Sequence, residues 1–151
     1  MSSPFSKIIT GEISSYKLYE DEYSYAFLNI YPHASGHTII VPKIEVDHFS
    51  DVPEPYYSAI WLTAKKLSPL LQKVTHCTRV CAIFSGFEIP HCHLHLIPSN
   101  DAHDLEFSHA KPAPPDELSA MQEQILAELT KQHVMCHSEQ SEESMPRVHR
   151  T

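Results

Sequence analysis

The stretch His91-Cys92-His93-Leu94-His95-Leu96-Ile97 alternates between histidine and less polar residues. Alternate residues of a β-strand point to the same face, so the pattern predicts a strand whose three histidines share one face, about 6.7 Å apart. The intervening residues then point into the core. Three imidazoles at strict period two are unusual for a plain solvated face, because each brings two ring nitrogens that need partners. The strand therefore indicates a functional site.

Two kinds of chemistry use such a row of imidazoles. His-x-His on a strand can supply two ligands to Zn²⁺, with a third ligand from elsewhere in the chain. Alternatively, one imidazole attacks a phosphorus while its neighbours bind or protonate the substrate. Cys92 faces away from the row, and Glu88 is separated from it by Pro90. The residues alone leave open both a zinc-binding protein and an enzyme with a phosphate site.

The rest of the chain predicts an α+β fold around this strand. Runs of aromatic and branched residues bounded by turn residues are typical of strands. Short hairpin links between such runs favour antiparallel pairing. We therefore expect an antiparallel sheet of about five strands, two main helices and a short N-terminal helix. The four further strands are predicted at Tyr16–Glu20, Tyr23–Ile30, His37–Pro42 and Arg79–Ser85.

Helical periodicity marks three segments. Apolar residues ahead of Gly11 predict a short N-terminal helix that stops at the glycine. A longer period runs from Asp51 to about Thr75, and Pro69 within it predicts a kink or an early end near Ser68. A final amphipathic helix opens at Pro115.

The predicted organisation is one domain over residues 1–115 with a C-terminal helix, 116–132, packed on it. From 133 to 151 the sequence has no apolar period, so we expect a solvated or disordered tail.

Composition limits the classes of protein. The chain has 151 residues, 42% hydrophobic and 20% charged, which is typical of one globular domain. Its net charge of −8 disfavours binding to a nucleic-acid backbone. We expect no membrane partner, since no apolar run approaches the roughly 20 residues that span a bilayer. The four cysteines lack Cys-x-x-Cys spacing and the start is polar, which predicts free thiols in a reducing cytoplasm.

Four segments, in this order, resemble the histidine triad superfamily of nucleotidyl hydrolases and transferases. Its opening segment is similar to Phe5–Ile13, its ribose-binding strand to Ala26–Ile30, its next strand to Gly36–Lys43, and its His-x-His-x-His motif to His91–Ile97. The likeness favours the bacterial nucleotide-binding and hydrolase branch. The resemblance implies a HIT-like fold and a homodimer, in which Trp61 and the first long helix are candidate interface elements.

The resemblance also implies catalytic roles. His93 attacks the α-phosphorus and forms a nucleotidyl-histidine, which water then cleaves. His95 protonates the leaving group, His91 contacts phosphate oxygens, and His37 supports the triad from behind. An imidazole suits the nucleophile because one nitrogen attacks while the other is held in a fixed tautomer.

Binding residues follow from the same likeness. Asn29 is expected to bind the ribose hydroxyls, since an amide is both donor and acceptor. An apolar slot for the base, preferably a purine, is expected from Phe5, Ile8, Phe27 and Ile30, whose alternative interpretation is plain core. Glu88 precedes the triad where a carboxylate repels phosphate, so we expect it to disfavour polyphosphate leaving groups.

One departure concerns zinc. Many bacterial members carry a structural zinc site whose matching positions here are Ser3, Ser6 and Glu45. Hydroxyls are weak zinc ligands, so we predict that this site is absent and that catalysis needs no metal or cofactor.

The sequence thus predicts a cytoplasmic, homodimeric hydrolase of purine nucleoside phosphoramidates or related AMP esters and anhydrides. The nearest alternative is a dinucleoside polyphosphate hydrolase on the same fold. Two others are a zinc-binding protein that uses the triad as ligands and a nucleotide-binding module without turnover.

Overall fold

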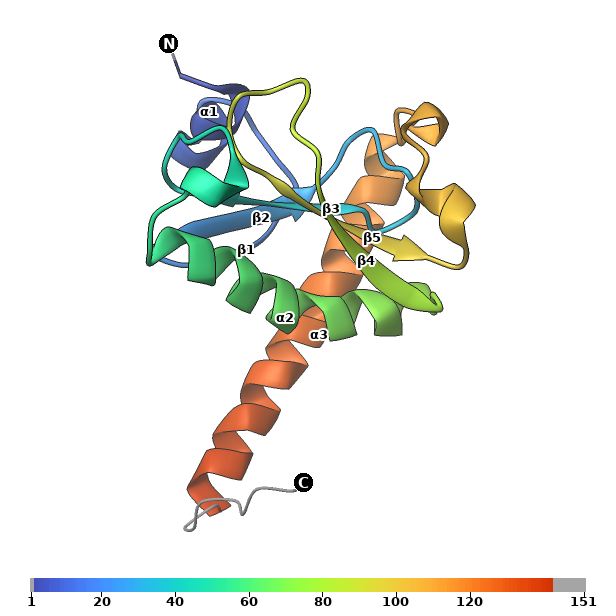
Figure 1. Ribbon diagram of the computed structural model, residues 1–151. Coiled ribbons are helices and arrows are strands. Elements are labelled where there is room, and N and C mark those ends of the chain that lie inside the picture. Colours follow the sequence, from blue (N-terminus) through green and yellow to red (C-terminus); the bar gives the residue numbers. More distant parts are fainter. Residues whose placement is uncertain (1, 143–151) are drawn as a thin grey trace, which may run out of the picture.

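Five strands form one antiparallel sheet in the order β1-β2-β3-β5-β4 (Figure 1). The computed structural model describes the backbone of residues 2–142 and the side chains of 2–108 and 110–132. The predicted α+β class and the five-stranded sheet are confirmed. The strands are β1 (Lys17–Glu20), β2 (Ser24–Leu28), β3 (Thr38–Pro42), β4 (Arg79–Phe84) and β5 (Leu94–Ser99).

Both faces of the sheet are covered, so β2 and β3 are buried along their whole length. On one face Ala26, Leu28 and Ile40 belong to the main core with α2 (Tyr56–Thr75) and α3 (Pro115–Glu142). On the other face a second apolar cluster forms under α1 (Pro4–Thr10). Its buried members are Phe5, Tyr25, Phe27, Ile39 and Val41. Figure 1 shows α1 and α2 on opposite sides of the sheet.

The histidine strand is shorter at its start than predicted. β5 begins at Leu94, so only His95 of the triad lies in the ladder, where it pairs with Ile39 and Ile83. Ahead of it, the Cys92 N–H donates to the Val46 carbonyl at 2.7 Å rather than to a neighbouring strand. The alternation still holds, because Cys92, Leu94 and Leu96 all belong to the main core, as predicted.

The first long helix does not end at its proline. α2 runs unbroken from Tyr56 to Thr75 with Pro69 inside it, so the expected end near Ser68 is wrong. Pro69 removes one helical hydrogen bond, but Leu67, Leu70 and Leu71 around it are buried against the sheet. Burial of three leucines outweighs the helix-interior proline, which costs roughly 3 kcal/mol.

The last helix is longer than predicted. α3 opens at Pro115 as expected but continues to Glu142, past the expected end at residue 132. Leu118 and Ile125 anchor its first half in the main core, and the second half extends away from the sheet in Figure 1. The part of the expected tail at 143–151 lies outside the described residues. Within the described range, no helix is long and apolar enough to cross a membrane.

Candidate active site

The predicted binding and catalytic residues converge on one cavity of about 880 Å³, on the α1 face of the sheet. This volume is ordinary for a small-molecule site. The predicted residues that line it are Phe5, Ile8, Phe27, Asn29, Ile30, Glu88, His93 and His95. His37 and His91 do not line it, and they lie behind the histidines that do.

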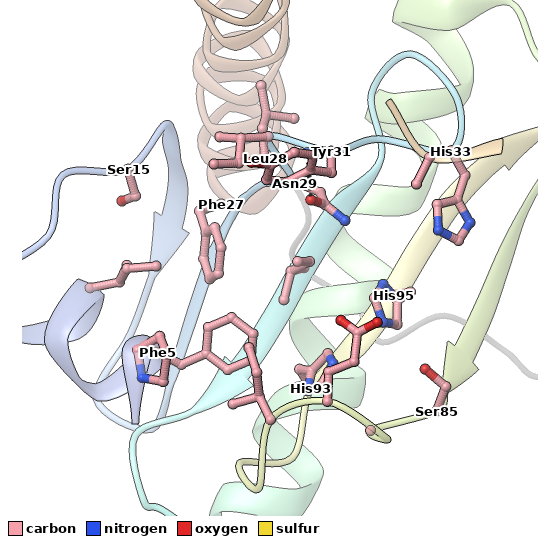
Figure 2. A pocket seen from close by; sticks show the side chains of 18 of the residues that line it. Phe5, Ser15, Phe27, Leu28, Asn29, Tyr31, His33, Ser85, His93 and His95 are labelled. Carbon is pink, nitrogen blue, oxygen red and sulfur yellow. Dashed lines mark hydrogen bonds between the residues drawn. The ribbon is translucent and has the colours of Figure 1, made fainter. Parts of the chain in front are cut away.

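The cavity has an apolar end and a polar end (Figure 2). Phe5 and Phe27 form the apolar end, with ring centroids 5.8 Å apart. His95 and Ser85 lie at the opposite end, and Asn29 lies between the two. Asn29 accepts a hydrogen bond from the Tyr31 N–H at 2.9 Å, which fixes the orientation of its amide. The arrangement fits a ligand with a flat apolar group, a polar middle and a reactive polar end.

His93 presents an unprotonated nitrogen to the cavity. Its Nδ1 lies 2.8 Å from the His91 carbonyl oxygen. A carbonyl can only accept, so the ring proton is on Nδ1 and the lone pair is on Nε2. Burial lowers the pKa of His93 below its ordinary value, which favours the neutral ring. A neutral imidazole in this tautomer is a nucleophile at neutral pH.

His95 is held in the opposite tautomer by a chain of hydrogen bonds. The His33 backbone N–H donates to His37 Nδ1 at 3.0 Å, so neutral His37 carries its proton on Nε2. That nitrogen donates to His95 Nδ1 at 2.9 Å, which leaves the His95 proton on Nε2. Burial lowers the pKa of His37 to about 2 and that of His95 to about 3, so both are neutral. His95 is thus a hydrogen-bond donor in the cavity.

His91 is not placed to contact phosphate, contrary to expectation. It is fully buried beneath α1, with the Phe5 ring packed edge-on against it at 5.7 Å. Its Nε2 donates to the Pro42 carbonyl at 3.0 Å, and its Nδ1 accepts from the Ser3 hydroxyl at 2.6 Å. Both ring nitrogens are therefore used inside the protein, and the hydrogen bond from His91 to the nucleophile is made by its backbone carbonyl.

Two aromatic residues at the polar end were not predicted. The His33 ring lies nearly parallel to the His95 ring at 6.3 Å, and Phe107 packs edge-on against both. His33 lies in the loop between Asn29 and His37, two predicted site residues. That position in the sequence could have indicated that His33 is near the site. Phe107 comes from a short turn, η3 (Phe107–His109), and no motif or periodicity in the sequence marks it.

The residues present do not fit a zinc ion. Ser3, Ser6 and Glu45 stand at the matching positions and hydrogen-bond to one another. Cys92 is packed in the main core, where burial raises the pKa of its thiol to about 11. Among the described residues, no three His, Cys, Asp or Glu side chains form a metal-binding group.

Two known proteins are similar to this chain in sequence. The yeast (Saccharomyces cerevisiae) adenosine 5'-monophosphoramidase is 39% identical over 98 residues, which cover 64% of this chain and 62% of the yeast protein. A HIT-like protein of Methanocaldococcus jannaschii is 35% identical over 124 residues, 76% of this chain and 93% of that protein.

The fold has solved counterparts. The crystal structure of a zinc-bound histidine triad family protein from Mycobacterium smegmatis superposes with a TM-score of 0.76 over 89% of this chain and 98% of that one; at 22% identity it supports the fold alone. The HIT domain profile matches residues 10–102, well over half of the sequence. With the fold and the histidine cluster in agreement, the chain belongs to the HIT-domain family.

Proposed function

We propose that this protein hydrolyses adenosine phosphoramidates and related AMP esters through a nucleotidyl-histidine intermediate on His93. The observation that carries the proposal is the pair of opposite tautomers in one cavity. His93 offers a lone pair on Nε2 and His95 offers a proton on Nε2, with ring centroids 5.0 Å apart. The similarity to an adenosine 5'-monophosphoramidase supports the substrate class.

The proposed reaction has two balanced steps. His93 Nε2 forms a bond to the α-phosphorus as the phosphorus–nitrogen bond breaks, and the departing nitrogen, hydrogen-bonded to the His95 Nε2–H, takes its proton from a water molecule. His95 stays neutral throughout, because a neutral imidazole is too weak an acid to give up its last ring proton. The hydroxide left from that water then attacks the phosphorus, and His93 leaves as the neutral imidazole. The products are the amine and AMP.

Substrate selection follows from the two ends of the cavity. The apolar end of Phe5, Ile8 and Phe27 suits a purine, and the amide of Asn29, which also lines the cavity, supports binding of the ribose hydroxyls. No Lys or Arg is among the described residues that line the cavity, and Glu88 supplies its only carboxylate. A leaving group with several phosphates meets this negative charge without a cation to offset it. The geometry therefore favours amine leaving groups over the dinucleoside polyphosphates of the rival function.

We also propose that the protein is a cytoplasmic homodimer. β4 is the last strand of the sheet, and an aromatic patch lies beside it. Phe49 stacks on Phe84 at 5.0 Å, and Trp61 packs edge-on against the same ring at 5.7 Å. Phe49 and Trp61 are each 39% exposed. Exposed large apolar side chains gathered beside an open strand edge favour a second copy of the chain as their cover.

Hydrolysis of an adenosine phosphoramidate in excess EDTA tests the enzyme function directly. The comparison uses the wild type, His93→Ala and, as a matched control, His103→Ala, whose side chain is 78% exposed outside the cavity. We expect turnover by the wild type and the control and none by His93→Ala. Rapid quenching of the wild type under alkaline conditions, followed by mass spectrometry, should detect AMP bound covalently to the peptide that contains His93.

If EDTA abolishes turnover, the histidines of the triad bind a metal that the reaction needs, and this mechanism is wrong. If His93→Ala retains turnover, His93 is not the nucleophile. A wild type that binds AMP without cleaving any adenosine phosphoramidate would instead support a binding module.

A further inference from the structure

A buried hydrogen-bond network joins the N-terminal segment to the nucleophile. Ser3 is 7% exposed, and its hydroxyl lies 2.6 Å from His91 Nδ1. The Pro42 carbonyl holds the other ring nitrogen of His91 at 3.0 Å. Burial lowers the pKa of His91, so the ring is neutral, with its proton on Nε2 toward Pro42 and its lone pair toward Ser3. The Ser3 hydroxyl is therefore the donor in this contact.

Ser3 is itself held from two directions. Its backbone N–H donates to Glu45 Oε1 at 2.6 Å, and the same carboxylate oxygen accepts from the Ser6 hydroxyl at 2.8 Å. These hydrogen bonds keep the pKa of Glu45 below its usual value, so it stays a carboxylate. The Ser6 N–H donates to the Ser3 hydroxyl at 3.0 Å, which caps α1. The network thus ties α1 and the segment after β3 to His91.

His91 passes this restraint on to the active site. Its carbonyl oxygen accepts the Nδ1–H of His93, the contact that places the His93 lone pair in the cavity. The ring and the carbonyl of His91 share one Cα, so the hydrogen bonds that anchor the ring also hold the backbone of His91 in place. Without that anchor the backbone can shift, and the His93 ring can lose its acceptor and adopt the other tautomer. Phe5 strengthens the coupling, because it comes from α1 and packs edge-on against both rings, at 5.7 Å on His91 and 4.9 Å on His93.

We propose that Ser3, supported by Ser6 and Glu45, is a positioning residue that keeps His93 in its nucleophilic tautomer. Ser3 acts through the His91 ring and carbonyl and does not touch the substrate. The inference rests on the proposed role of His93 as nucleophile.

Two variants of Ser3 and one control separate positioning from helix capping. Glycine is tolerated at a helix N-cap at a cost of a few tenths of a kcal/mol, so Ser3→Gly removes the hydroxyl with little loss of α1. Ser3→Thr keeps both the cap and the donor to His91. Ser50→Gly is the matched control, since Ser50 is exposed and its hydroxyl bonds only to the side chain of His48 among the contacts found.

Two readouts decide the question. We expect Ser3→Gly to slow formation of the nucleotidyl-enzyme about tenfold in single turnover, with KM and the urea midpoint little changed. The ¹⁵N chemical shifts of the His93 ring should show Nδ1–H in the wild type and a mixture of tautomers in Ser3→Gly. Ser3→Thr should restore both, and Ser50→Gly should alter neither.

The ring shifts also separate this inference from the function on which it rests. A changed His93 tautomer in Ser3→Gly, in a protein that turns over no phosphoramidate, would support the positioning role and contradict the proposed function. An active wild type whose Ser3→Gly variant keeps both the tautomer and the rate would overturn the positioning role. A loss of rate that merely follows loss of folded protein, with an unchanged tautomer, would overturn it as well.

Discussion

Burial is the largest cause of the lowered pKa values of the histidines at this site. His37 and His95 are 1% and 6% exposed, and their pKa values fall to about 2 and about 3. In the unfolded chain both titrate near 6.5. Between these values the unfolded state binds protons that the folded state does not. The free energy of unfolding therefore falls as the pH drops below 6.5.

The pH dependence of stability should show this proton uptake. We expect urea midpoints to be flat above pH 6.5 and to fall below it, and His37→Gln to lose less than the wild type over the same interval. The difference should be roughly 1 kcal/mol between pH 6.5 and 5.5. Urea titrations of both proteins from pH 7.5 to 5.5 measure it. Parallel curves would mean that folding does not lower the pKa of His37.

Glu88 is the residue to which we attribute leaving-group selection. Replacing its carboxylate by a neutral amide removes the repulsion of a polyphosphate. We expect Glu88→Gln to raise the ratio of dinucleoside polyphosphate to phosphoramidate turnover several-fold. Glu123→Gln, on an exposed position of α3, is the matched control for charge. An unchanged ratio in Glu88→Gln would show that the carboxylate does not face the leaving group.

At the scale of elements, the turn into β3 depends on a glycine. Gly36 has φ = 86°, and a Cβ there would lie 3.0 Å from Thr75 Cγ2 and 3.3 Å from Pro98 Cγ. The left-handed backbone and the close approach of α2 and β5 both disfavour a side chain. The next residue is His37, so the turn also orients the histidine whose Nε2–H donates to His95 Nδ1.

Two glycines with the same backbone allow a controlled test. Gly11 has φ = 87° but nothing within 4 Å of its Cβ position. We expect Gly11→Ala to cost about 1 kcal/mol of unfolding free energy from backbone strain alone. Gly36→Ala should cost about 2 kcal/mol or more, because the side chains of Thr75 and Pro98 must also shift to make room for the new methyl group. Chemical denaturation measures both, and equal losses would mean that the neighbours of Gly36 move without cost.

Element predictions succeeded where the deciding forces are local. All five strands were found because aromatic and branched residues stand between turn residues, and α1 ends at Gly11 as its sequence indicates. Of the two outcomes expected at Pro69, a kink or an early helix end, the early end did not occur, because the stabilisation comes from residues packed against the sheet, which local propensity does not contain. The start of β5 was placed early because the alternation of side chains continues into a segment that pairs with no strand.

At the scale of the whole molecule, the aromatic patch beside β4 bears on assembly. We expect Trp61→Glu to convert the proposed dimer to a monomer, since it puts a charge beside Phe49 and Phe84. Light scattering coupled to size exclusion measures the mass. Lys65→Glu, an exposed charge change on the same helix, is the control for altered surface charge. A wild type that is monomeric at high concentration would contradict the homodimer.

The chain sequence alone was enough to predict the α+β sheet, the core-facing side of the histidine strand and eight residues that line the cavity. These follow from period-two alternation, turn residues and a family motif, all of which are local in the chain. The roles of the individual histidines depend instead on contacts between residues far apart in the sequence. His37 meets His95 across 58 positions and Ser3 meets His91 across 88.

Those long-range contacts determine which imidazole nitrogen carries a proton. The tertiary structure also holds the His91 ring on the Pro42 carbonyl, outside the cavity, and places His33 and Phe107 beside His95 in the cavity lining. A tautomer depends on whether the neighbour of each nitrogen is a donor or an acceptor. Only the packing of α1, β3 and β5 against one another supplies those neighbours, so the chemistry of the site emerges with the tertiary structure.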